Sequence, residues 1–501
     1  MEINAKSIGQ IYKNRYNPDK TAILYKEEAI TYRELDDHAI AYANYFKSLG
    51  VKPSDKFMLD AGNSPEFFYT YLGVVRNAAV IVPVNPMLTL DELTYIAENS
   101  DAKYMLIQEG VMAKHGFTTE VLEQTLGVKL IILNEDFLEA VSKAPREDFD
   151  LVKDPSEIST FLYTSGTTGK PKAAMLSHSN LLENSAQTDL GLGMRSDDIT
   201  MCVLPMFHVF AFTLCILMPV FGGGTSAIVE NFLPKEVIAD LISKDVTVFM
   251  GVPAMYIVLI EAGKKNITFP KLRMATSGGA ALPVEVYRQA RDNINLTILE
   301  GYGLTEASPG VAFNPPSIQK PGSIGLPLPE SVVRIGDEND EALPVGEVGE
   351  LLLRGPNIMQ GYYKLPEATA ETLQNGWLHT GDLAKIDEDG YIYIVDRKKD
   401  MIIVSGLNVY PREVEEVLYT HPKVKEAAVI GEEDLLRGET VVAYIVLKEG
   451  ETAHHKEILR WLKTKLAVYK IPRRIEIIDN LPKNASGKIL KRLLKENKVE
   501  S

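Results

Sequence analysis

The sequence contains little cysteine, little tryptophan and no surplus of positive charge. Its two cysteines, Cys202 and Cys215, are too few for a disulfide scaffold in 501 residues, so we expect a reducing compartment, the cytoplasm. Lysine and arginine number 53 against 68 aspartates and glutamates, which gives a formal charge of −15. This charge disfavours non-specific binding to nucleic acid or to an anionic membrane. A polyanionic ligand therefore needs a local basic site.

Features of a membrane-targeted protein are also scarce. The first twenty residues contain no apolar core of the length that a signal peptide needs. Residues 201–221, MCVLPMFHVFAFTLCILMPVF, reach about the 20 residues that can span a bilayer, but Pro205, His208 and Pro219 interrupt them and no strong basic flank precedes them. We interpret this stretch as the buried wall of a pocket. Peripheral contact with a membrane stays open, and so does the oligomeric state, monomer or homodimer.

The first half of the chain alternates between strand and helix signals. Capping boxes at Thr31–Glu34 and Thr89–Glu92 each predict the start of a helix, and Ser64-Pro65 predicts another. Short apolar runs lie between them: KFMLD, AVIVPV and KYMLI. Such runs are typical of strands buried on both faces. The alternation predicts an α/β fold in which helices cover a mostly parallel sheet.

The second half is different in texture. After residue 330, short strand patterns are joined by Gly, Pro, Asn and Asp turns. The charged run DRKKD, residues 396–400, precedes a compact α+β block with helix and strand patterns of its own. Since 501 residues are too many for one ordinary core, we expect two domains, 1–398 and 399–501, with the boundary in the charged run.

The segment YTSGTTGKPK, residues 163–172, combines glycines, hydroxyls and lysines and has little to bury. It is not a Walker phosphate loop, because Thr164 stands where that motif needs glycine and Pro171 follows Lys170. Its backbone N–H groups and hydroxyls can still form a nest for an anion, with lysine as the counter-charge. Taken alone, the segment is more typical of a flexible surface turn.

The segment LEGYGLTEAS, residues 299–308, places a carboxylate, an aromatic ring and small residues in one short loop. Tyr302 can stack on a base, Thr305 can bond a phosphate, and Glu306 can hold Mg²⁺ through oxygen. A tight turn followed by a helix cap explains the same residues without a ligand.

Two further segments have candidate polar residues. Asp382 lies in the Gly-Asp turn of WLHTGDLAKID, where its carboxylate can bind the ribose hydroxyls; an Asx-turn is the alternative. Lys488 follows a flexible Ser-Gly in LPKNASGKILKR. Considered alone, that lysine fits a solvated terminal residue.

Together these segments form an ordered set: YTSGTTGKPK, TSGGA, GYGLTE, TGD, DRKKD, GLNVYPREVEE and PKNASGK. In this set the chain resembles the adenylate-forming superfamily of acyl-CoA synthetases, aryl-CoA ligases, firefly luciferase and peptide-synthetase adenylation domains, with a pattern most similar to bacterial fatty-acid–CoA ligases. It departs at Ala173, where many relatives have glycine, and alanine is small enough to be tolerated. The resemblance implies a large N-terminal domain of parallel-rich sheets with a distorted β-barrel, and a small mobile C-terminal domain.

The resemblance also implies roles for individual residues. Those expected to hold the phosphates of ATP are Thr164, Ser165, Gly166, Thr167, Thr168, Gly169 and Lys172. Those expected around the adenosine are Gly279, Ala280, Tyr302, Gly303, Asp382 and Arg397. Those expected to hold Mg²⁺ are Glu306 and Thr164. Those expected to act in catalysis are Lys488, Glu306, Thr305 and His208.

For the second half-reaction, the resemblance implies that the small domain turns about a hinge at Lys399. Lys488 then leaves the site, and Ser405 and Gly406 line a tunnel for the pantetheine of coenzyme A. Coenzyme A is the expected thiol because no carrier-protein domain is attached to the chain.

The segment PMFHVFAFT, residues 205–213, is expected from the resemblance to line the acid pocket, with His208 at its gate. Amino-acid-activating relatives carry an aspartate there for the substrate ammonium, whereas His208 has apolar neighbours and offers no such partner. A dicarboxylic acid needs a basic residue, and none occurs in residues 200–221. The acid is therefore predicted to be apolar, either fatty or aryl. Considered alone, His208 fits a hydrogen-bonded core histidine.

The sequence thus predicts an ATP-dependent, AMP-forming acyl-CoA synthetase of fatty-acid metabolism, which makes acyl-AMP and passes the acyl group to coenzyme A. Three alternatives stay open. They are a stand-alone adenylation enzyme that loads the phosphopantetheine of a carrier protein, an aryl-CoA ligase, and a non-catalytic sensor of an acyl group or nucleotide. Joint retention of the expected phosphate, metal, ribose and acid-activating residues argues against the sensor.

Overall fold

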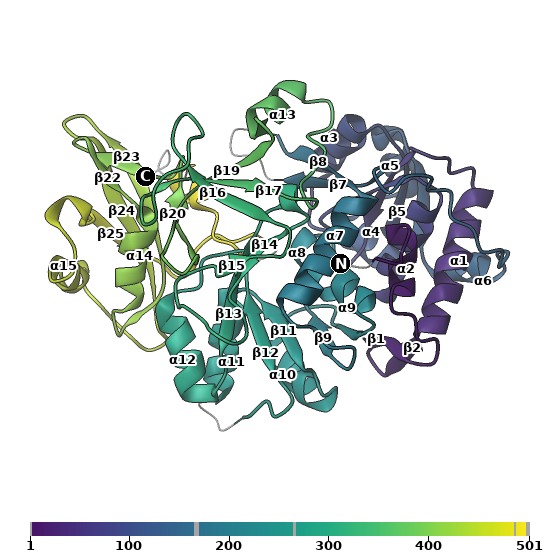
Figure 1. The fold of residues 1–501 in the computed structure, drawn as a ribbon, viewed down its shortest axis with the longest axis horizontal. Coiled ribbons are helices and arrows are strands. Elements are labelled where there is room, and N and C mark those ends of the chain that lie inside the picture. Colours follow the sequence, from purple (N-terminus) through teal and green to yellow (C-terminus); the bar gives the residue numbers. More distant parts are fainter. Residues whose placement is uncertain (1–2, 165–169, 264–266, 485–486, 497–501) are drawn as a thin grey trace.

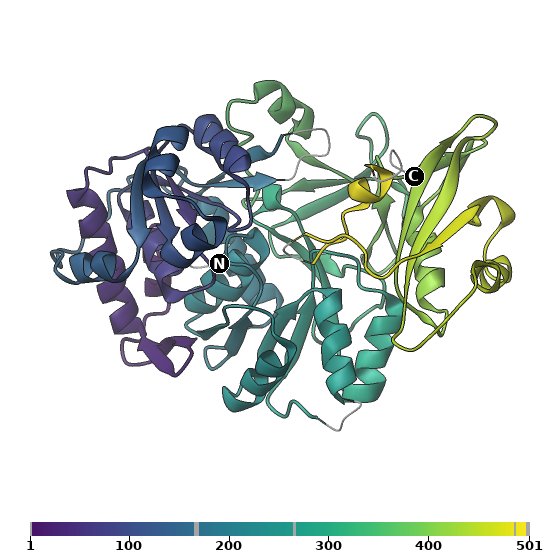
Figure 2. The same ribbon diagram turned by 180° about the vertical axis from the view of Figure 1, so that it is seen from behind.

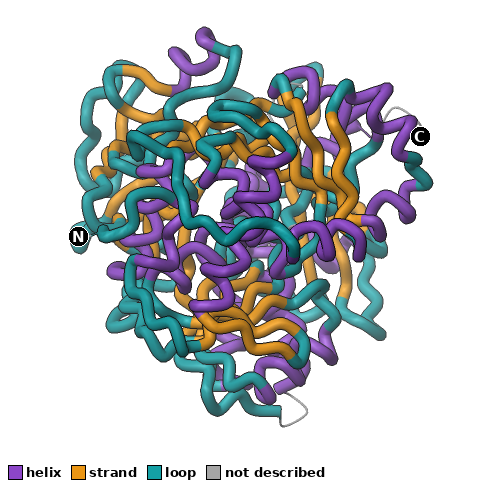
Figure 3. The backbone as a smooth tube through the Cα atoms, turned by 90° about the vertical axis from the view of Figure 1, so that its right-hand side faces the viewer, coloured by secondary structure: helices purple, strands orange, loops and turns teal. Residues whose placement is uncertain are grey.

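The computed structural model describes residues 3–164, 170–263, 267–484 and 487–496. A broad body holds the N-terminal and central parts of the chain, and a smaller block at one end holds the C-terminal part (Figure 1). Strands are grouped into sheets with helices packed between and around them (Figure 3). The α/β fold with a large and a small domain is therefore confirmed.

One sheet of the large domain has the strand order β6-β5-β3-β4-β7-β8 and is parallel except for β8. Its strands are β3 (Lys56–Asp60), β4 (Val80–Pro83), β5 (Ala102–Gln108), β6 (Lys129–Leu133), β7 (Ile158–Thr164) and β8 (Lys172–Ser177). The helices of this region are α1 (Tyr32–Ser48), α2 (Pro65–Arg76), α3 (Leu90–Ser100), α4 (Glu109–His115), α5 (Thr119–Leu126) and α6 (Glu135–Ser142). Both predicted capping boxes are present, and α2 starts with proline after Ser64 as predicted.

A second sheet has the order β15-β14-β13-β12-β11-β9-β10-β1-β2. Its strands are β1 (Thr21–Tyr25), β2 (Glu28–Thr31), β9 (Ile199–Cys202), β10 (Thr225–Ile228), β11 (Val248–Gly251), β12 (Met274–Ser277), β13 (Ile298–Gly303), β14 (Gly310–Phe313) and β15 (Leu326–Pro327). The run from β13 to β1 is parallel. The segments that follow β9, β11, β12 and β13 therefore leave the same edge of the sheet, where α/β proteins build their ligand sites.

Helices and short helical turns accompany this second sheet. They are the 3-10 helices η1 (Ile8–Lys13) and η3 (Thr305–Ala307), and α7 (His178–Gly191), α8 (Val209–Ala211), α9 (Met218–Phe221), α10 (Pro234–Ser243), α11 (Pro253–Gly263) and α12 (Val284–Ile294). The π-helix η2 (Phe212–Leu217) connects α8 to α9.

The apolar stretch 201–221 is folded into the large domain. It forms the end of β9, a turn, and then α8, η2 and α9, and residues 209–221 are all buried. The predicted burial of this stretch is thus confirmed, and its role as the wall of a pocket stays a prediction. Within the described residues, none of the helices combines the length and apolarity required to cross a membrane.

An antiparallel sheet links the large domain to the small one. Its order is β16-β17-β19-β18, with β20 paired to β19, and its strands are β16 (Val332–Gly336), β17 (Gly349–Arg354), β18 (Leu373–Gln374), β19 (Trp377–Ile386) and β20 (Ile392–Arg397). Helix α13 (Pro366–Thr372) precedes β18. Inward residues such as Ile335, Leu351 and Ile392 share a core with Val311 of β14. The strand order of this sheet is open, and the distorted barrel that the resemblance implies stays a prediction.

The small domain has a sheet of order β22-β21-β24-β23, with β25 paired to β24. Its elements are β21 (Ile402–Val404), β22 (Leu407–Val409), α14 (Pro411–Tyr419), β23 (Val424–Asp434), β24 (Gly438–Leu447), α15 (His455–Lys463), η4 (Val468–Lys470), β25 (Arg474–Ile477) and α16 (Lys491–Glu496). Its two apolar clusters are built from residues 402–494. Seen from behind, the chain that follows β25 extends from this domain toward the large one (Figure 2).

Candidate active site

The expected phosphate-binding turn joins β7 to β8. Thr164 and Lys172 pair across this hairpin, and the Thr164 hydroxyl donates to the Lys172 carbonyl at 3.5 Å. Beyond the turn, Tyr95 of α3 donates its hydroxyl to the Pro171 carbonyl at 2.9 Å. The turn residues Ser165, Gly166, Thr167, Thr168 and Gly169 lie outside the described residues. The two arms that carry the turn are thus anchored to each other and to α3.

The carboxylate of Asp382 is the centre of a buried polar cluster. Asp382 is 3% exposed and pairs across β19 and β20 with Arg397, whose Nε lies 2.8 Å from Oδ1. Tyr302 of β13 donates its hydroxyl to Oδ2 of the same carboxylate. Burial, followed by the charge of Asp382, raises the pKa of Tyr302 well above its usual range. Tyr302 therefore stays a hydrogen-bond donor, and the cluster joins β13 to β19 and β20.

A second cluster surrounds Glu306, which lies in η3 beside Thr305. Tyr362 donates its hydroxyl to Glu306 Oε1 at 2.6 Å. The ammonium of Lys172 lies 5.2 Å from the centre of the same Tyr362 ring, within the range of a cation–π contact. The pKa of Arg397 lies above its usual value. Burial acts to lower this pKa, but the negative charges of Asp382 and, more weakly, Glu306 are among those that raise it. Arg397 thus links the two clusters electrostatically.

Lys488 reaches this region from the small domain. The preceding Gly487 has φ +82°, and a Cβ there would lie 3.2 Å from Val252 Cγ2 of the large domain. The Lys488 N–H donates to Asn484 Oδ1 at 2.9 Å. Although part of the residue is exposed, burial and then the charge of Arg397 lower the pKa of its ammonium, and Asp382 opposes them. Lys488 therefore lies near the Asp382 cluster.

His208 lies at the start of α8, where its Nδ1 accepts a hydrogen bond from the Phe210 N–H at 3.3 Å. Burial lowers the pKa of His208 to about 4, and the nearby charge of Lys488 contributes to this shift. The imidazole is therefore neutral at pH 7, with its proton on Nε2. His208 and Lys488 thus face a common region from the two domains.

The segments that follow β9, β11 and β12 meet beside His208. A Cβ at Gly278 would lie 3.2 Å from Phe210 Cζ, and a Cβ at Gly279 would lie 3.7 Å from Val252 Cγ1. Gly279 has φ +74° and is exposed, and Ala280 is half-buried. The backbone at the exposed Gly279 is therefore open on one side, while the Phe210 ring covers the side of Gly278.

The remaining predicted residues fall in two places. Gly303 ends β13, where a Cβ would lie 2.4 Å from the Pro309 carbonyl, so a larger residue does not fit. Ser405 and Gly406 form the exposed turn between β21 and β22, and among the described residues no atom lies within 4 Å of a Cβ at Gly406. The structure therefore brings Tyr302, Asp382 and Arg397 together and places Lys172 near Glu306 through Tyr362. It places Ser405 and Gly406 on an open surface of the small domain.

Two family models match the chain. The model described as AMP-binding enzyme matches residues 12–363, and the model described as AMP-binding enzyme C-terminal domain matches residues 413–488. The chain belongs to the AMP-binding enzyme family. The resemblance to the adenylate-forming superfamily is confirmed.

Curated relatives of this AMP-binding enzyme include a feruloyl-CoA synthase from Amycolatopsis sp., 36% identical over 484 residues, which are 96% of each chain. A long-chain-fatty-acid–CoA ligase from Bacillus subtilis is 33% identical over 522 aligned positions, covering 97% of this chain and 93% of the relative. Both similarities span nearly the full length of this AMP-binding enzyme.

Among solved structures, ATP-bound MatB from Rhodopseudomonas palustris is 30% identical with a TM-score of 0.92 over 99% of both chains. Apo MatB from the same organism has a TM-score of 0.82 over the same share. An anthranilate CoA ligase, AuaEII, in complex with anthranoyl-AMP is 26% identical, with a TM-score of 0.92 over 98% of this chain and 97% of that one. The arrangement of this AMP-binding enzyme is thus more similar to the ATP-bound form of MatB than to its apo form.

Tyr362 is absent from the predicted residues, although the structure places it between Glu306 and Lys172. Its sequence signal is weak, because it stands in MQGYYKLPEA, where two adjacent tyrosines are equally apolar and aromatic. The neighbouring Tyr363 instead donates to Asp101 Oδ2 at 2.8 Å, away from Glu306.

Proposed function

We propose that this enzyme is an ATP-dependent, AMP-forming acid–thiol ligase that activates an apolar carboxylic acid as acyl-AMP and transfers the acyl group to coenzyme A. The observation that carries the proposal is the meeting of Asp382, Arg397 and Tyr302 with Lys488 of the small domain, beside Glu306 and Lys172. The CoA ligases among its relatives support it. ATP and coenzyme A are then its co-substrates and Mg²⁺ its cofactor.

In the first half-reaction, a carboxylate oxygen of the acid attacks the α-phosphorus of ATP. A P–O bond forms to the acid, the bond to the bridging oxygen of the β-phosphate breaks, and pyrophosphate leaves. Both reactants are anions, so positive side chains must reduce their repulsion. Lys488 places its ammonium beside the attacking carboxylate and the bridging oxygen. Thr305 contacts the α-phosphate, and Lys172 with residues 164–169 holds the β- and γ-phosphates.

The nucleoside is held by the buried cluster. Asp382 accepts the ribose hydroxyls and Arg397 orients its carboxylate, since the two side chains already pair at 2.8 Å. Tyr302, with the neighbouring glycines of β13, lies on one side of the adenine, and the open backbone at Gly279 and Ala280 lies on the other.

Glu306 and Thr164 are the proposed holders of Mg²⁺. The ion is usually bound through one or two carboxylates together with substrate phosphates and water, and Glu306 offers a single carboxylate fixed by Tyr362. Mg²⁺ supplies neutralisation of the phosphate charge. Within the described residues, no cluster of at least three His, Cys, Asp or Glu side chains is placed to hold a metal.

In the second half-reaction, the thiol of coenzyme A gives its proton to water and attacks the acyl carbonyl. A C–S bond forms, the bond between the acyl carbon and the phosphate oxygen breaks, and AMP leaves. We propose that the small domain turns about Lys399 for this step, so that Lys488 withdraws and Ser405 and Gly406 line the pantetheine. The exposure of both turn residues supports this role, because they are open to a new partner.

The acid is proposed to lie between His208, Phe210 and Gly278. These groups are neutral or apolar near pH 7, which disfavours a second charge on the substrate. Fatty acids fit this apolar wall and the long-chain relatives. An aryl acid is the second candidate, favoured by the feruloyl-CoA synthase and the anthranilate CoA ligase among the relatives.

Pyrophosphate release and thioester formation test the proposal. The acids are hexanoate, decanoate, palmitate, benzoate, ferulate, an amino acid (leucine) and a diacid (succinate), each without a thiol, with coenzyme A and with a phosphopantetheinylated carrier protein. We expect acid-dependent release without the thiol and thioester formation with it. Activity that peaks on an amino acid or a diacid would contradict the apolar pocket. A thioester formed only on a carrier protein would favour the stand-alone adenylation enzyme.

The role of Lys488 is tested with Lys488→Ala. We expect acid-dependent pyrophosphate release to fall by about a hundredfold, on the order of 3 kcal/mol, while thioester formation from supplied acyl-adenylate is retained. Lys483→Ala is a matched control, because Lys483 is in the same segment but pairs with Glu426 at 2.8 Å. Equal losses in both half-reactions would refute the assignment.

A further inference from the structure

Arg412, in the first turn of α14, makes contacts that cross from the small domain to the large one. Its Nη1 donates to the Ile394 carbonyl at 2.9 Å, its Nη2 lies 3.5 Å from Glu300 Oε1, and its backbone N–H donates to Asp396 Oδ2 at 2.9 Å. Only 14% of the Arg412 side chain is exposed. All three partners precede residue 399, so these contacts depend on the present orientation of the two domains.

Glu416, one turn further along α14, makes a second crossing contact. Its Oε2 accepts the backbone N–H of Val284 at 3.3 Å, and Val284 is the first residue of α12. The first N–H groups of a helix lack partners within the helix and favour a negative charge. Arg412 Nε lies 4.0 Å from Glu416 Oε1. The guanidinium therefore stands between the carboxylates of Glu300 and Glu416.

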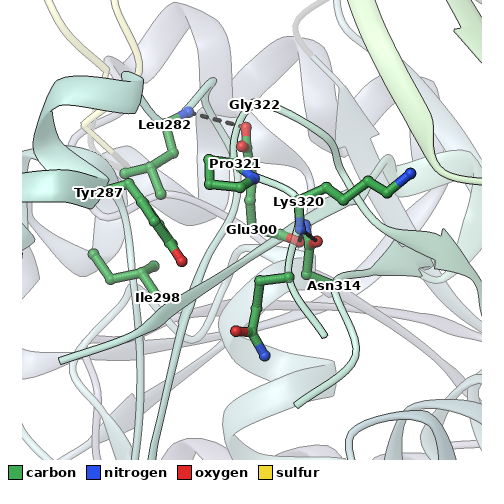
Figure 4. A pocket seen from close by; sticks show the side chains of 9 residues that line it. Leu282, Tyr287, Ile298, Glu300, Asn314, Lys320, Pro321 and Gly322 are labelled. Carbon is green, nitrogen blue, oxygen red and sulfur yellow. Dashed lines mark hydrogen bonds between the residues drawn. The ribbon is translucent and has the colours of Figure 1, made fainter. Parts of the chain in front are cut away.

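Glu300 connects this contact to the proposed nucleotide site. Its Oε1, the atom nearest Arg412, also accepts the Leu282 N–H at 3.1 Å (Figure 4). Leu282 follows Ala280 by two residues, and Glu300 precedes Tyr302 by two residues on β13. One carboxylate oxygen thus contacts both the loop beside the proposed adenine position and the small domain.

The guanidinium of Arg412 matters to Glu300 because the Glu300 carboxylate is deeply buried, with 5% exposure. Burial raises the pKa of Glu300 to about 7, and Arg412 is the largest of the groups that oppose the rise. A buried carboxylate that loses its counter-charge must take up a proton or gain water. Either change alters the hydrogen bond that holds Leu282.

We propose that Arg412 and Glu416 are positioning residues that fasten the adenine-side loop to the small domain during adenylation and release it for thioester formation. This inference rests on the proposed function. In the described orientation, Arg412 fixes Glu300 and Glu416 fixes the start of α12. When the small domain turns, both contacts break together and the loop beside the nucleotide is freed.

The test is Arg412→Met, which removes the charge and keeps an unbranched side chain. We expect acid-dependent pyrophosphate release to fall at least tenfold with a raised KM for ATP, and thioester formation from supplied acyl-adenylate to stay within twofold of the parent. Arg460→Met, on the exposed face of α15, is the control and leaves both half-reactions unchanged. Equal slowing of both half-reactions by Arg412→Met would overturn the proposal.

A distance measurement separates this proposal from the proposed function. Spin labels at Val345→Cys in the large domain and Leu435→Cys in the small domain, both exposed, report the domain orientation with MgATP bound. We expect a narrow distance distribution in the parent and a broadened one in Arg412→Met. An unchanged distribution in an active enzyme would overturn the role of Arg412 and leave the proposed function standing, whereas an enzyme that activates none of the acids would overturn the proposed function itself.

A double variant tests the pairing with Glu300. Glu300→Gln already removes the carboxylate charge. The further change Arg412→Met therefore slows pyrophosphate release much less in this variant than it does in the parent. We expect the double variant to release pyrophosphate no more than threefold slower than the slower single variant. Multiplication of the two single losses would contradict a contact between these residues.

Discussion

Tyr362 is the residue on which two proposed ligand-binding groups depend. Its hydroxyl holds the Glu306 carboxylate at 2.6 Å, and its ring supports the Lys172 ammonium at 5.2 Å. Burial, followed by the charge of Glu306, raises the pKa of Tyr362 above its usual range, so the hydroxyl stays protonated and donates. The two functions reside in different atoms of one side chain, and substitution can therefore separate them.

Tyr362→Phe keeps the ring and removes the hydroxyl. A hydrogen bond to a charged group contributes about 1.5–3 kcal/mol, so we expect the Mg²⁺ concentration for half-maximal pyrophosphate release to rise about tenfold, with a smaller change in KM for ATP. Tyr362→Leu also removes the ring, and we expect it to raise KM for ATP further. Identical profiles for the two variants would contradict separate roles for hydroxyl and ring.

The sequence predicts residues within short motifs well and residues that bridge motifs poorly. Asp382 and Arg397 are predicted because TGD and DRKKD are both distinctive, and the pairing of β19 with β20 brings them together. Tyr362 and Arg412 are not predicted, because their partners Glu306 and Glu300 come from β13 and the loop after it. Such contacts depend on the packing of separate sheets, which no local pattern encodes.

At the level of elements, the reliable predictions are those with local causes. The capping boxes of α1 and α3 are satisfied within three residues, so the sequence alone determines both helix starts. The π-helix η2 is different. Its apolar sequence is compatible with an ordinary helix, and in the structure it is buried against α7 and β9. The sequence predicts that this segment is buried but not how it is wound.

The end of β3 carries a buried carboxyl group whose titration makes the stability of the fold depend on pH. Asp60 is 2% exposed, and its Oδ1 has no hydrogen-bond partner among the described residues. Burial raises the pKa of Asp60 from 3.8 to about 7. Between these values the folded protein holds a proton that the unfolded chain releases, so the stability of the fold decreases as pH rises toward 7.

Asp60→Asn removes this titration. We expect the variant to gain thermal stability over the parent progressively from pH 4.5 to pH 7, by on the order of 2–4 kcal/mol in total, and the gap to stay constant from pH 7.5 to pH 9. Melting temperatures of both proteins across this range provide the measurement. The exposed Asp479→Asn serves as the control. A gap independent of pH would show that Asp60 is not titrating.

At the scale of the whole molecule, we propose the domain boundary at residues 398 and 399. The apolar clusters of the small domain draw only on residues 402–494, so this part carries its own core. The family match for the C-terminal domain begins later, at residue 413. The hairpin of β21 and β22 lies between these two points and contributes Ile402, Val404 and Val409 to the core.

A fragment of residues 399–501 should therefore fold alone. We expect a cooperative thermal transition in circular dichroism and dispersed amide resonances. A fragment that begins at residue 413 lacks the hairpin and exposes the core beneath it, so we expect it to lack both signatures. Equal folding of the two fragments would place the boundary later than we propose.

The two natural thiols have a practical consequence for following the domains in motion. Cys202 and Cys215 are fully buried, and burial together with a thiol–thiol hydrogen bond raises the pKa of Cys202 well above its usual range. Maleimide and methanethiosulfonate reagents are electrophiles that an accessible thiolate attacks. Probes can therefore be attached to engineered surface cysteines without replacing the native ones, and the enzyme observed in such experiments keeps its own interior.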